Sequence, residues 1–557
     1  MMLVAKALHD ALPPDAVVMR LSAREAMSEL FIVDVEVACT DATLDLASFA
    51  WSTMAVVLAM DEAPEQDPRW FHGIVEEARL VRSTRLATYY RFRLRPLVHG
   101  LDYRVRTRLF QEKCAVDVVK QVLSEAGLAD DAFVWATSGQ DPVRELCMQY
   151  REAELAFVLR LLEDEGIYYW FEHDETGHRM HLTDDGSGIA LIDGSAVLTF
   201  TERQDPDTEH ITDVRWSTDL CSDAHITRDW SWENPNDVVE SEQSTPTAAG
   251  FTRYEYPGGF RAADDGGRRA LARLRESTLS EMELVGRTAC RRLSPGRIFG
   301  VVGAQPSMID GDYLIVSVRH EYAHIEGAGR GPVYAAHVRA IPSSHPFAPP
   351  RVTPKPRVAG KESAVITGPA GEEIHVDSMG RVKVHFYFDR ENPVDDTASC
   401  WVRTQQVNLG GSMVLPRLGW EVSVGFQEGD PDRPVVMQKL YNRETLPPLS
   451  LPAEKTKTAL ESTSSPGGGN TNSIIMGDAG GAMTFAMHAS KKLMVMAGND
   501  MSRTVKVNRK AEIGIHDNLA VVGDETVEVS GTQTVSVTAN TTLGTTASKT
   551  VTIKGAE

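Results

Sequence analysis

The sequence predicts a mainly β protein with a few helices, whose last part is a needle of strands intertwined from three copies of the chain. Two observations predict this fold class. Short segments that alternate apolar and polar residues recur up to about residue 441, and a repeat without aromatic side chains occupies the C-terminus. A chain of 557 residues is long enough for several domains, each with its own core.

The charge balance is acidic, with 57 basic and 78 acidic side chains and a formal net charge of −21. Proteins that bind a nucleic-acid backbone neutralise phosphates with clustered lysines and arginines. The sequence contains no run of basic residues of this kind. We therefore expect no nucleic-acid partner.

The cysteines are thinly spread and none forms a CxxC pair, which favours reduced, buried thiols in a protein made in the cytoplasm. They are Cys39, Cys114, Cys147, Cys221, Cys290 and Cys400. The first residues lack the long apolar stretch and cleavage site of a signal peptide, and no window reaches the roughly 18 apolar residues that span a bilayer. If the protein leaves the cell, we expect it to avoid the general export route.

Residues 1–350 are predicted to form a mixed base with strands and a few helices. The segment 31–37 alternates apolar and polar residues, as a half-buried strand does. The segments 115–126 and 152–165 instead carry apolar residues at the three-four spacing of one helix face, and a third helix is expected near 268–281. The base therefore combines sheet with helical cover.

Composition marks two further boundaries. A proline-rich stretch from 342 to 356 separates the base from a segment of about five short strands at 360–445, which suits a small β-barrel of the oligonucleotide/oligosaccharide-binding (OB) type. Residues 446–470, rich in proline and glycine, are predicted to form a linker. The needle is predicted to cover 471–557, where 8 basic and 8 acidic residues nearly cancel.

The needle contains an eight-residue repeat built on the pattern Val-x-Val. Thr526-Val527-Glu528-Val529 recurs at 534–537 and at 550–553. Two apolar residues spaced by two lie on one face of a strand, so these side chains are predicted to form the core of the needle. The predicted core residues are Val505, Val507, Ile513, Ile515, Val527, Val529, Val535, Val537, Val551 and Ile553.

The upstream copies predict an irregularity. Val505 and Val527 are 22 residues apart rather than 24, which predicts that the register slips by two residues near Asn518. Each eight-residue step supplies one short strand and a bend of turn-forming residues. Such a step is too short for one chain to enclose a core, whereas three chains around one axis would close it and pair every strand edge. A disordered Thr/Ser/Gly tail is the alternative, which the regular spacing disfavours.

Candidate catalytic and metal-binding groups are better explained by structure. Residues 163–165 are three adjacent carboxylates at a helix end, which do not face one another as a catalytic pair would. His72 has no identifiable nucleophile beside it and is expected to be structural. His173, His178 and His181 lack a fourth ligand. We expect no catalytic residue, no metal site and no cofactor.

Motifs spread along the chain resemble one family, the valine-glycine repeat (VgrG) proteins of the type VI secretion system, which are similar to the hub and spike of a contractile phage tail. The motifs are FHGIV (71–75), RLFQEK (108–113), QYREAELAFVLRLLEDEGIYYWFEH (149–173), YPGG (256–259), LSPG (293–296), DYLIVSVRH (312–320), GPAGEEIHVDSMGRVKVHFYFDR (368–390), CWVRTQQ (400–406) and PRLGWEVSVGFQEGDPDRPVV (416–436).

The resemblance implies a non-enzymatic puncturing spike, a homotrimer that penetrates the target membrane mechanically. It implies that the base stacks on a hexameric inner-tube protein (Hcp) and that a PAAR-repeat protein caps the tip, with effectors or their adaptors as cargo. Docking of the tip protein would fall to Lys554, Gly555, Ala556 and Glu557. The spike would wait in the bacterial cytoplasm and then be secreted or injected without a signal peptide.

Two alternatives stay open. The chain could be the spike of a phage-like or extracellular contractile particle, or a trimeric β-helix that cleaves glycans. The second needs aromatic platforms, and no aromatic residue follows Phe485. Because the sequence ends at Glu557, we expect no toxin domain after the needle, and the 446–470 segment has no room for an inserted lysozyme.

Overall fold

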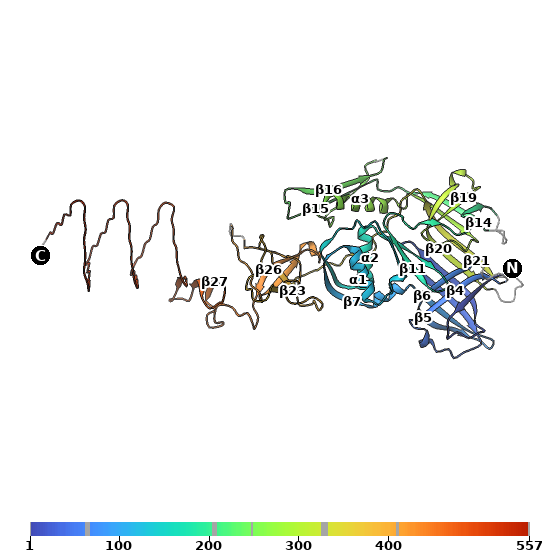
Figure 1. Cartoon of the computed structure of the whole chain (residues 1–557), viewed down its shortest axis with the longest axis horizontal. Helices are drawn as coiled ribbons and strands as arrows, with labels where there is room; N and C mark the ends of the chain where they lie inside the picture. Colours follow the sequence, from blue (N-terminus) through green and yellow to red (C-terminus); the bar gives the residue numbers. More distant parts are fainter. Residues whose placement is uncertain are drawn as a thin grey trace. The chain divides into compact units, whose positions relative to one another are not determined.

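The computed structural model describes residues 2–61, 67–202, 209–246, 249–324, 332–407 and 411–554 (Figure 1). The chain divides into two compact units, Met1–Met487 and His488–Glu557. The first unit contains the predicted base and barrel, and each unit is described by itself.

The base is organised around a 13-stranded sheet in which neighbouring strands are mostly antiparallel. Strands β2 and β20 pair antiparallel in the middle and join the early strands to the late ones. In sheet order the strands are β1 (Leu3–Leu8), β4 (Thr53–Met60), β5 (Arg69–Ser83), β6 (Thr88–Arg95), β3 (Ile32–Cys39), β2 (Val17–Ala26), β20 (Gly311–Ala323), β21 (Val333–Pro342), β18 (Met282–Thr288), β14 (His210–Thr218), β13 (Val197–Phe200), β19 (Arg297–Val302) and β12 (Ala190–Leu191).

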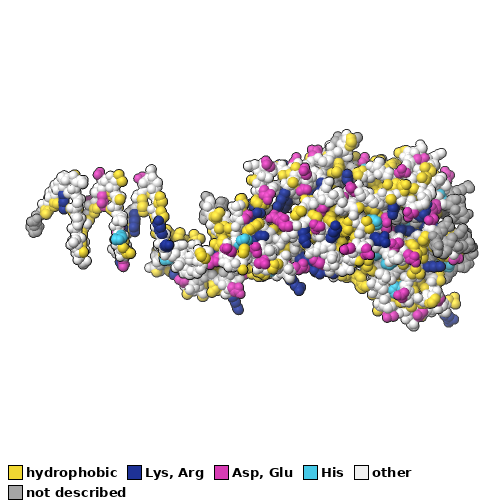
Figure 2. Space-filling model, viewed as in Figure 1, with side chains coloured by type: hydrophobic (Ala, Val, Ile, Leu, Met, Phe, Trp, Pro, Cys, Tyr) yellow, Lys and Arg dark blue, Asp and Glu magenta, His cyan; other side chains and the backbone are white. Residues whose placement is uncertain are grey.

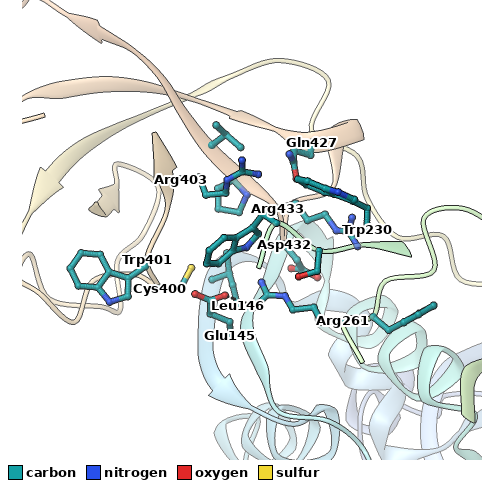
Figure 3. A pocket seen from close by; sticks show the side chains of 15 residues that line it. Glu145, Leu146, Trp230, Arg261, Cys400, Trp401, Arg403, Gln427, Asp432 and Arg433 are labelled. Atoms are coloured by element: carbon teal, nitrogen blue, oxygen red, sulfur yellow. Dashed lines mark ion pairs between the residues drawn. The ribbon is translucent and has the colours of Figure 1, made fainter. Parts of the chain in front are cut away.

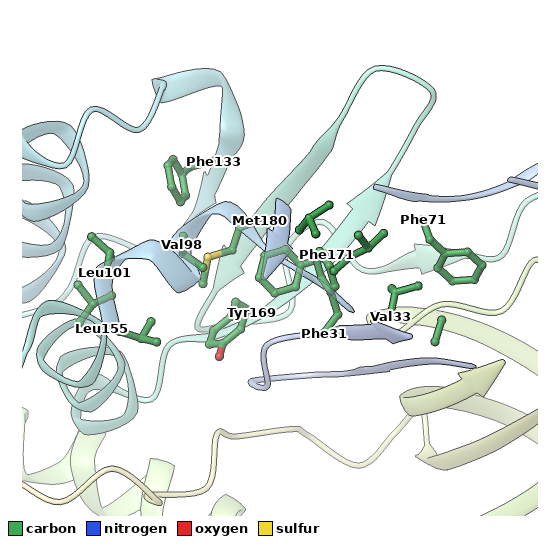
Figure 4. Packing of buried hydrophobic residues seen from close by; sticks show 14 of the residues in the cluster. Phe31, Val33, Phe71, Val98, Leu101, Phe133, Leu155, Tyr169, Phe171 and Met180 are labelled. Carbon is green, nitrogen blue, oxygen red and sulfur yellow. The ribbon is translucent and has the colours of Figure 1, made fainter. Parts of the chain in front are cut away.

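The predicted strand at 31–37 is confirmed as β3. Its residues Val33, Val35 and Val37 are fully buried, because side chains two apart on a strand point to the same face. That face belongs to the largest core cluster, which extends from Phe71 in the sheet, past Phe31 and Phe171, to Leu155 in a helix (Figure 4). One continuous apolar core therefore joins sheet and helices.

The three predicted helices are confirmed, with shifted ends. They are α1 (Ala115–Glu125), α2 (Glu154–Glu165) and α3 (Ala263–Thr278). Helix α2 stops at Gly166, whose left-handed φ of 73° suits a residue without a Cβ. Helix α3 begins earlier than expected, since Asp264 and Asp265 favour the first turn of a helix. Short 3₁₀ helices are η1 (Leu46–Phe49), η2 (Leu97–Tyr103), η3 (Asp130–Ala132), η4 (Ser307–Ile309) and η5 (Gln427–Gly429).

Small sheets flank the helices. They are β10-β11-β8, β16-β15-β17 and the pair β7-β9. Their bounds are β7 (Val105–Lys113), β8 (Phe133–Ala136), β9 (Arg144–Ala153), β10 (Tyr168–His173), β11 (His178–Thr183), β15 (Ala224–Trp230), β16 (Val238–Ser244) and β17 (Thr252–Glu255).

The predicted OB-type barrel is present as a five-stranded sheet of order β23-β22-β25-β26-β24. A bridge between Val382 and Val402 joins the two end strands and closes it. Residues 412–415 form no strand. The strands are β22 (Glu362–Thr367), β23 (Lys383–Phe386), β24 (Arg403–Thr404), β25 (Glu421–Phe426) and β26 (Pro434–Leu440).

The segment predicted as a linker contains a strand, so that prediction is wrong in part. Strand β27 (Lys457–Thr463) pairs antiparallel with β28 (Thr471–Gly477), and β29 (Thr484–His488) completes a three-stranded sheet. The glycines at 467–469, which dominated the composition, form the turn between β27 and β28, where all three have positive φ.

The surface carries charges of both signs. Figure 2 shows acidic and basic side chains interspersed over the visible face of the first unit, without a basic patch. No helix in the described parts of the chain is long and apolar enough to cross a membrane.

Candidate trimer interface and hub–barrel joint

The second unit repeats with an unbroken period of eight residues. Beyond β29 the described residues form no strand within the single chain, and the backbone instead turns sharply at regular pairs of positions (Figure 1). These bends fall at 490–491, 498–499, 506–507, 514–515, 522–523, 530–531, 538–539 and 546–547. The predicted register slip near Asn518 is therefore wrong: Val505 corresponds to Val529, 24 residues or three steps later.

Two rows of apolar side chains run along the unit in phase with the bends. The first row holds the residue just before each bend and is apolar at every step from 497 to 553 except Thr545. Its large members are Val505, Ile513, Val521, Val529, Val537 and Ile553. The second row lies two residues earlier, interrupted by Arg503, and its large members are Val495, Leu519, Val527, Val535, Leu543 and Val551.

The rows differ in how far the chain itself covers them. First-row side chains are 45–59% exposed, and second-row side chains are 65–76% exposed. Val507 and Ile515, which were predicted to be core residues, lie at bends and are each 86% exposed. They occupy the positions that Gly523 and Gly531 hold in later repeats, so they belong to neither row.

The other predicted core residues all lie in one of the rows. Val495, Leu519, Val521 and Leu543 were missed, and counting eight residues back from Val529 would have found Val521. Among the predicted tip-docking residues, Lys554 is exposed, whereas Gly555, Ala556 and Glu557 lie outside the described residues. Which residues form the core and the tip stays a prediction.

A single copy leaves both rows in water. Burying an aliphatic side chain of this size is worth about 1.5–3 kcal/mol. A dozen exposed ones therefore leave a large free energy of burial that a single copy does not gain. The extended segments between bends also present unpaired backbone groups, which associate with other strands. The arrangement therefore requires other chains to cover it.

In the first unit, ion pairs fasten the base to the barrel. Lys355, just before the barrel, lies with Nζ 2.6 Å from Asp430 Oδ1 and 2.8 Å from Asp432 Oδ2. The other oxygen of Asp432 accepts the main-chain N–H of Met148 at 2.6 Å. Burial alone would lower the pKa of Lys355, but the two carboxylates outweigh burial and raise it.

A ladder of arginines makes a second connection. Glu154, fully buried at the start of α2, receives Arg104 Nε at 2.6 Å and Arg106 Nε at 2.9 Å. Arg106 also reaches Glu391 of the barrel at 3.1 Å, and the buried Arg108 lies 3.5 Å from the same carboxylate. The guanidinium groups are thus shared between a carboxylate of the base and one of the barrel.

The three histidines considered as metal ligands do not converge. His181 stacks on Trp170 and lies 3.2 Å from Glu172. His173 and His178 instead cluster with His72, whose main-chain N–H donates to His173 Nδ1 at 3.1 Å and whose Nδ1 lies 3.4 Å from His178 Nδ1. Among the described residues no group of histidine, cysteine and acidic side chains is arranged to hold a metal ion.

The histidine cluster continues to a buried carboxylate. Glu25 pairs with Arg69 at 2.5 Å and lies 3.2 Å from His173 and 3.5 Å from His320. Burial would raise the pKa of Glu25, yet Arg69 and the two histidines hold it well below its usual value. Burial lowers the pKa of His320, and burial with neighbouring histidines lowers that of His178 to about 2.

The carboxylates at 163–165 hold structure together. Glu163 accepts the main-chain N–H groups of Val352 and Thr353 at 3.1 and 2.9 Å. Glu165 is buried among Arg144, Arg268 and Arg269. Their partners lie on different elements, so the two carboxylates do not form a catalytic pair.

Comparison with known families gives three matches along the chain. Residues 24–324 match the phage tail baseplate hub family (GPD), and residues 372–441 match the type VI secretion system/phage-baseplate injector OB domain. Residues 458–557 match the bacteriophage T4 gp5 C-terminal trimerisation domain. The matched ranges overlap the predicted base, barrel and needle, although the exact domain limits stay predictions.

Individual proteins agree. Type VI secretion system spike protein VgrG1b of Pseudomonas aeruginosa is 32% identical over 510 residues, covering 89% of this chain and 68% of that protein. Actin cross-linking toxin VgrG1 of Vibrio cholerae is 29% identical over 82% of this chain and 43% of its own length. The solved E. coli c3393 protein, a component of the type VI secretion system, shares the fold with a TM-score of 0.58 and 23% identity, over 78% of this chain and all of that one.

A baseplate hub, an injector barrel and a trimerisation domain together define the spike of a contractile injection apparatus. The chain belongs to the VgrG family of type VI secretion system spike proteins.

The two rows predict where a charge disrupts the assembly. Val521→Asp should abolish a detergent-resistant trimer, since carboxylates from several copies would be buried together without partners, at a cost of at least about 3 kcal/mol. Val507→Asp, at an exposed bend, is the matched control and should leave the trimer intact. Unboiled samples on a denaturing gel give the readout. Equal sensitivity of both variants would contradict the assignment of the rows.

Glu154 predicts the strength of the hub–barrel joint. Glu154→Gln keeps the shape but leaves Arg104, Arg106 and Arg108 without their buried carboxylate, which should destabilise the first unit by about 3–5 kcal/mol. The thermal unfolding midpoint measures this loss. Glu175→Gln, at an exposed turn, should shift the midpoint little, and an unchanged midpoint for Glu154→Gln would show that the joint does not depend on the ladder.

The histidine cluster predicts sensitivity to acid. Because the folded pKa values of His72, His178 and His320 lie below 6.5, the unfolded chain binds protons first as the pH falls. Stability should be complete above about pH 6.5 and should fall below it, with a slope of at most about 1.4 kcal/mol per pH unit for each histidine until the pH reaches its folded pKa.

Unfolding midpoints at pH 7.5 and pH 5.0 test this dependence. His178→Asn should reduce the difference between the two midpoints, whereas His516→Asn, on the exposed second unit, should behave as the parent protein. A parent protein whose midpoint is the same at both pH values would contradict the prediction.

Proposed function

We propose that this chain acts as a non-enzymatic homotrimeric puncturing spike of a type VI secretion apparatus. The observation that carries the proposal is the unbroken eight-residue repeat with two apolar rows that a single copy leaves exposed. The match of residues 458–557 to a trimerisation domain supports three copies. The trimer penetrates the target membrane by force, so the chain needs interlocked strands rather than a reactive group.

The partners follow from this role. The base stacks on a hexameric inner-tube ring of the Hcp kind, and residues 554–557 receive a PAAR-repeat tip protein. Effectors or their adaptors travel with the spike, which waits in the cytoplasm and leaves without a signal peptide. Membership of the family and the hub match support this arrangement. Nucleic acid is not a partner, which the net charge of −21 supports.

The contacts of the candidate catalytic groups support a mechanical, non-enzymatic function. The carboxylates at 163 and 165 are occupied by backbone amides and arginines, and His72 is occupied by other histidines. One relative is named an actin cross-linking toxin. We do not assign that activity to the described residues of this chain. The phage-like or extracellular particle is the alternative setting, and it would use the same trimer.

The proposal is tested by mass and by export. The purified chain of 61.2 kDa should sediment as a species of three times that mass, 183.6 kDa, at micromolar concentration. In a bacterium with an active apparatus, the chain should reach the medium only when the contractile sheath is intact, and Val521→Asp should not be exported while Val507→Asp is. A folded monomer, or export that persists without the sheath, would refute the spike.

A further inference from the structure

A hollow lined by tryptophan and arginine lies where the barrel, β9 and the sheet of β15 meet, all within the first unit. The hollow is shallow, with a volume of about 80 Å³, and we call it the tryptophan pocket. Figure 3 shows Arg403, from β24, directed toward Trp230 at the end of β15.

The outer face of the barrel places cations and aromatic rings together here. Val382 and Val402 bridge β23 to β24 and are buried, so their neighbours along each strand point outward. Lys383 Nζ lies 5.1 Å from the ring centre of Trp401, and Arg403 Cζ lies 5.7 Å from that of Trp230. The rings hold the two cations in place without neutralising them.

Other arginines around the pocket are already paired. Arg433 lies 2.5 Å from the buried Asp229, and Arg261 lies 2.8 Å from Glu145. Among the described residues, Arg403 and Lys383 have no carboxylate within ion-pair distance. Arg403 in the pocket and Lys383, which lies beside the lining residue Trp401, therefore offer two positive charges without an ion-pair partner, on a protein whose net charge is −21.

We propose that the tryptophan pocket docks an acidic segment of a cargo protein, one that carries an apolar ring next to carboxylates. The ring would pack against Trp230, and the carboxylates would reach Arg403 and Lys383. Tryptophan and arginine dominate the binding energy of protein interfaces, and arginine binds carboxylates through strong charge-assisted hydrogen bonds. The proposal rests on the proposed spike function, because it assigns a place for its cargo.

Charge complementarity selects this partner over others. A nucleic-acid strand presents one charge per nucleotide and needs many cations along its path, whereas Arg403 and Lys383 supply two. A short acidic peptide needs only two positive groups and an apolar platform. A second copy of the chain covering this face would instead tie the pocket to trimer formation, which the test distinguishes.

The experiment uses the purified full-length trimer and fluorescein-labelled synthetic heptapeptides. The probes are an acidic peptide, Gly-Asp-Phe-Pro-Asp-Glu-Gly, and its basic counterpart with lysine in place of each acidic residue. Anisotropy should show binding of the acidic peptide alone. Arg403→Glu should weaken it at least about tenfold, since one direct charge contact is worth more than 1.4 kcal/mol, and Trp230→Ala should weaken it likewise.

Lys439→Glu is the matched control. Lys439 is also a lysine stacked on an aromatic ring, 3.7 Å from the centre of Trp420, but it does not line the pocket. This variant should bind the acidic peptide within about twofold of the parent, because its charge lies outside the contact. Equal losses in Arg403→Glu and Lys439→Glu would reduce the effect to overall charge and overturn the proposal.

Further outcomes separate the alternatives. Absence of peptide binding to the parent trimer overturns the docking site, as does a 15-nucleotide oligothymidine that binds in place of the peptide and is lost in Arg403→Glu. If Trp230→Ala breaks the trimer, the face is an interface between copies. Sedimentation and export are measured on the same samples, so a trimer that is exported but binds no peptide refutes the docking site alone.

Discussion

An eight-residue step holds too few apolar side chains for one chain to enclose a core, and the second unit is built under that limit. First-row residues such as Val521 and Val529 are spaced so that each repeat offers an equivalent contact. The described residues leave about half of each of these side chains exposed, so order in this unit depends on other copies. In the proposed trimer neighbouring chains would share their strand edges, so opening one chain would require opening the others, which would give the assembly kinetic stability.

The first unit differs, because its apolar cores are buried within the single chain. Its barrel must also be held in place against the base. Buried ion pairs add little net stability compared with apolar packing, but they penalise any arrangement that separates the partners. The ladder from Arg106 to Glu154 and Glu391, and the contacts of Lys355 with Asp432, act in this way. The joint is thus specified by charge and stiffened by the core around it.

Local periodicity allowed much of this fold to be predicted. The spacing of apolar residues predicts helix α1 and strand β3. The register of the eight-residue repeat could not be predicted in this way. Val507 is apolar although it lies at a bend where later repeats have glycine, and only the positions of the bends show that Val505 belongs to a row and Val507 does not. The histidine cluster could not be predicted for another reason. His72 and His173 are about a hundred residues apart, and sequence spacing carries no signal for such a contact.

The aromatic residues divide the chain by task. All 9 tryptophans precede residue 421, and no aromatic residue follows Phe485. A needle must present the same small, polar outer face at every step, so it has no place for a large exposed ring that would bind other surfaces before firing. Recognition by large side chains is therefore confined to the first unit. There Arg403 lies 5.7 Å from the ring centre of Trp230 with no ion-pair partner among the described residues, and the proposed acidic partner would supply the carboxylate.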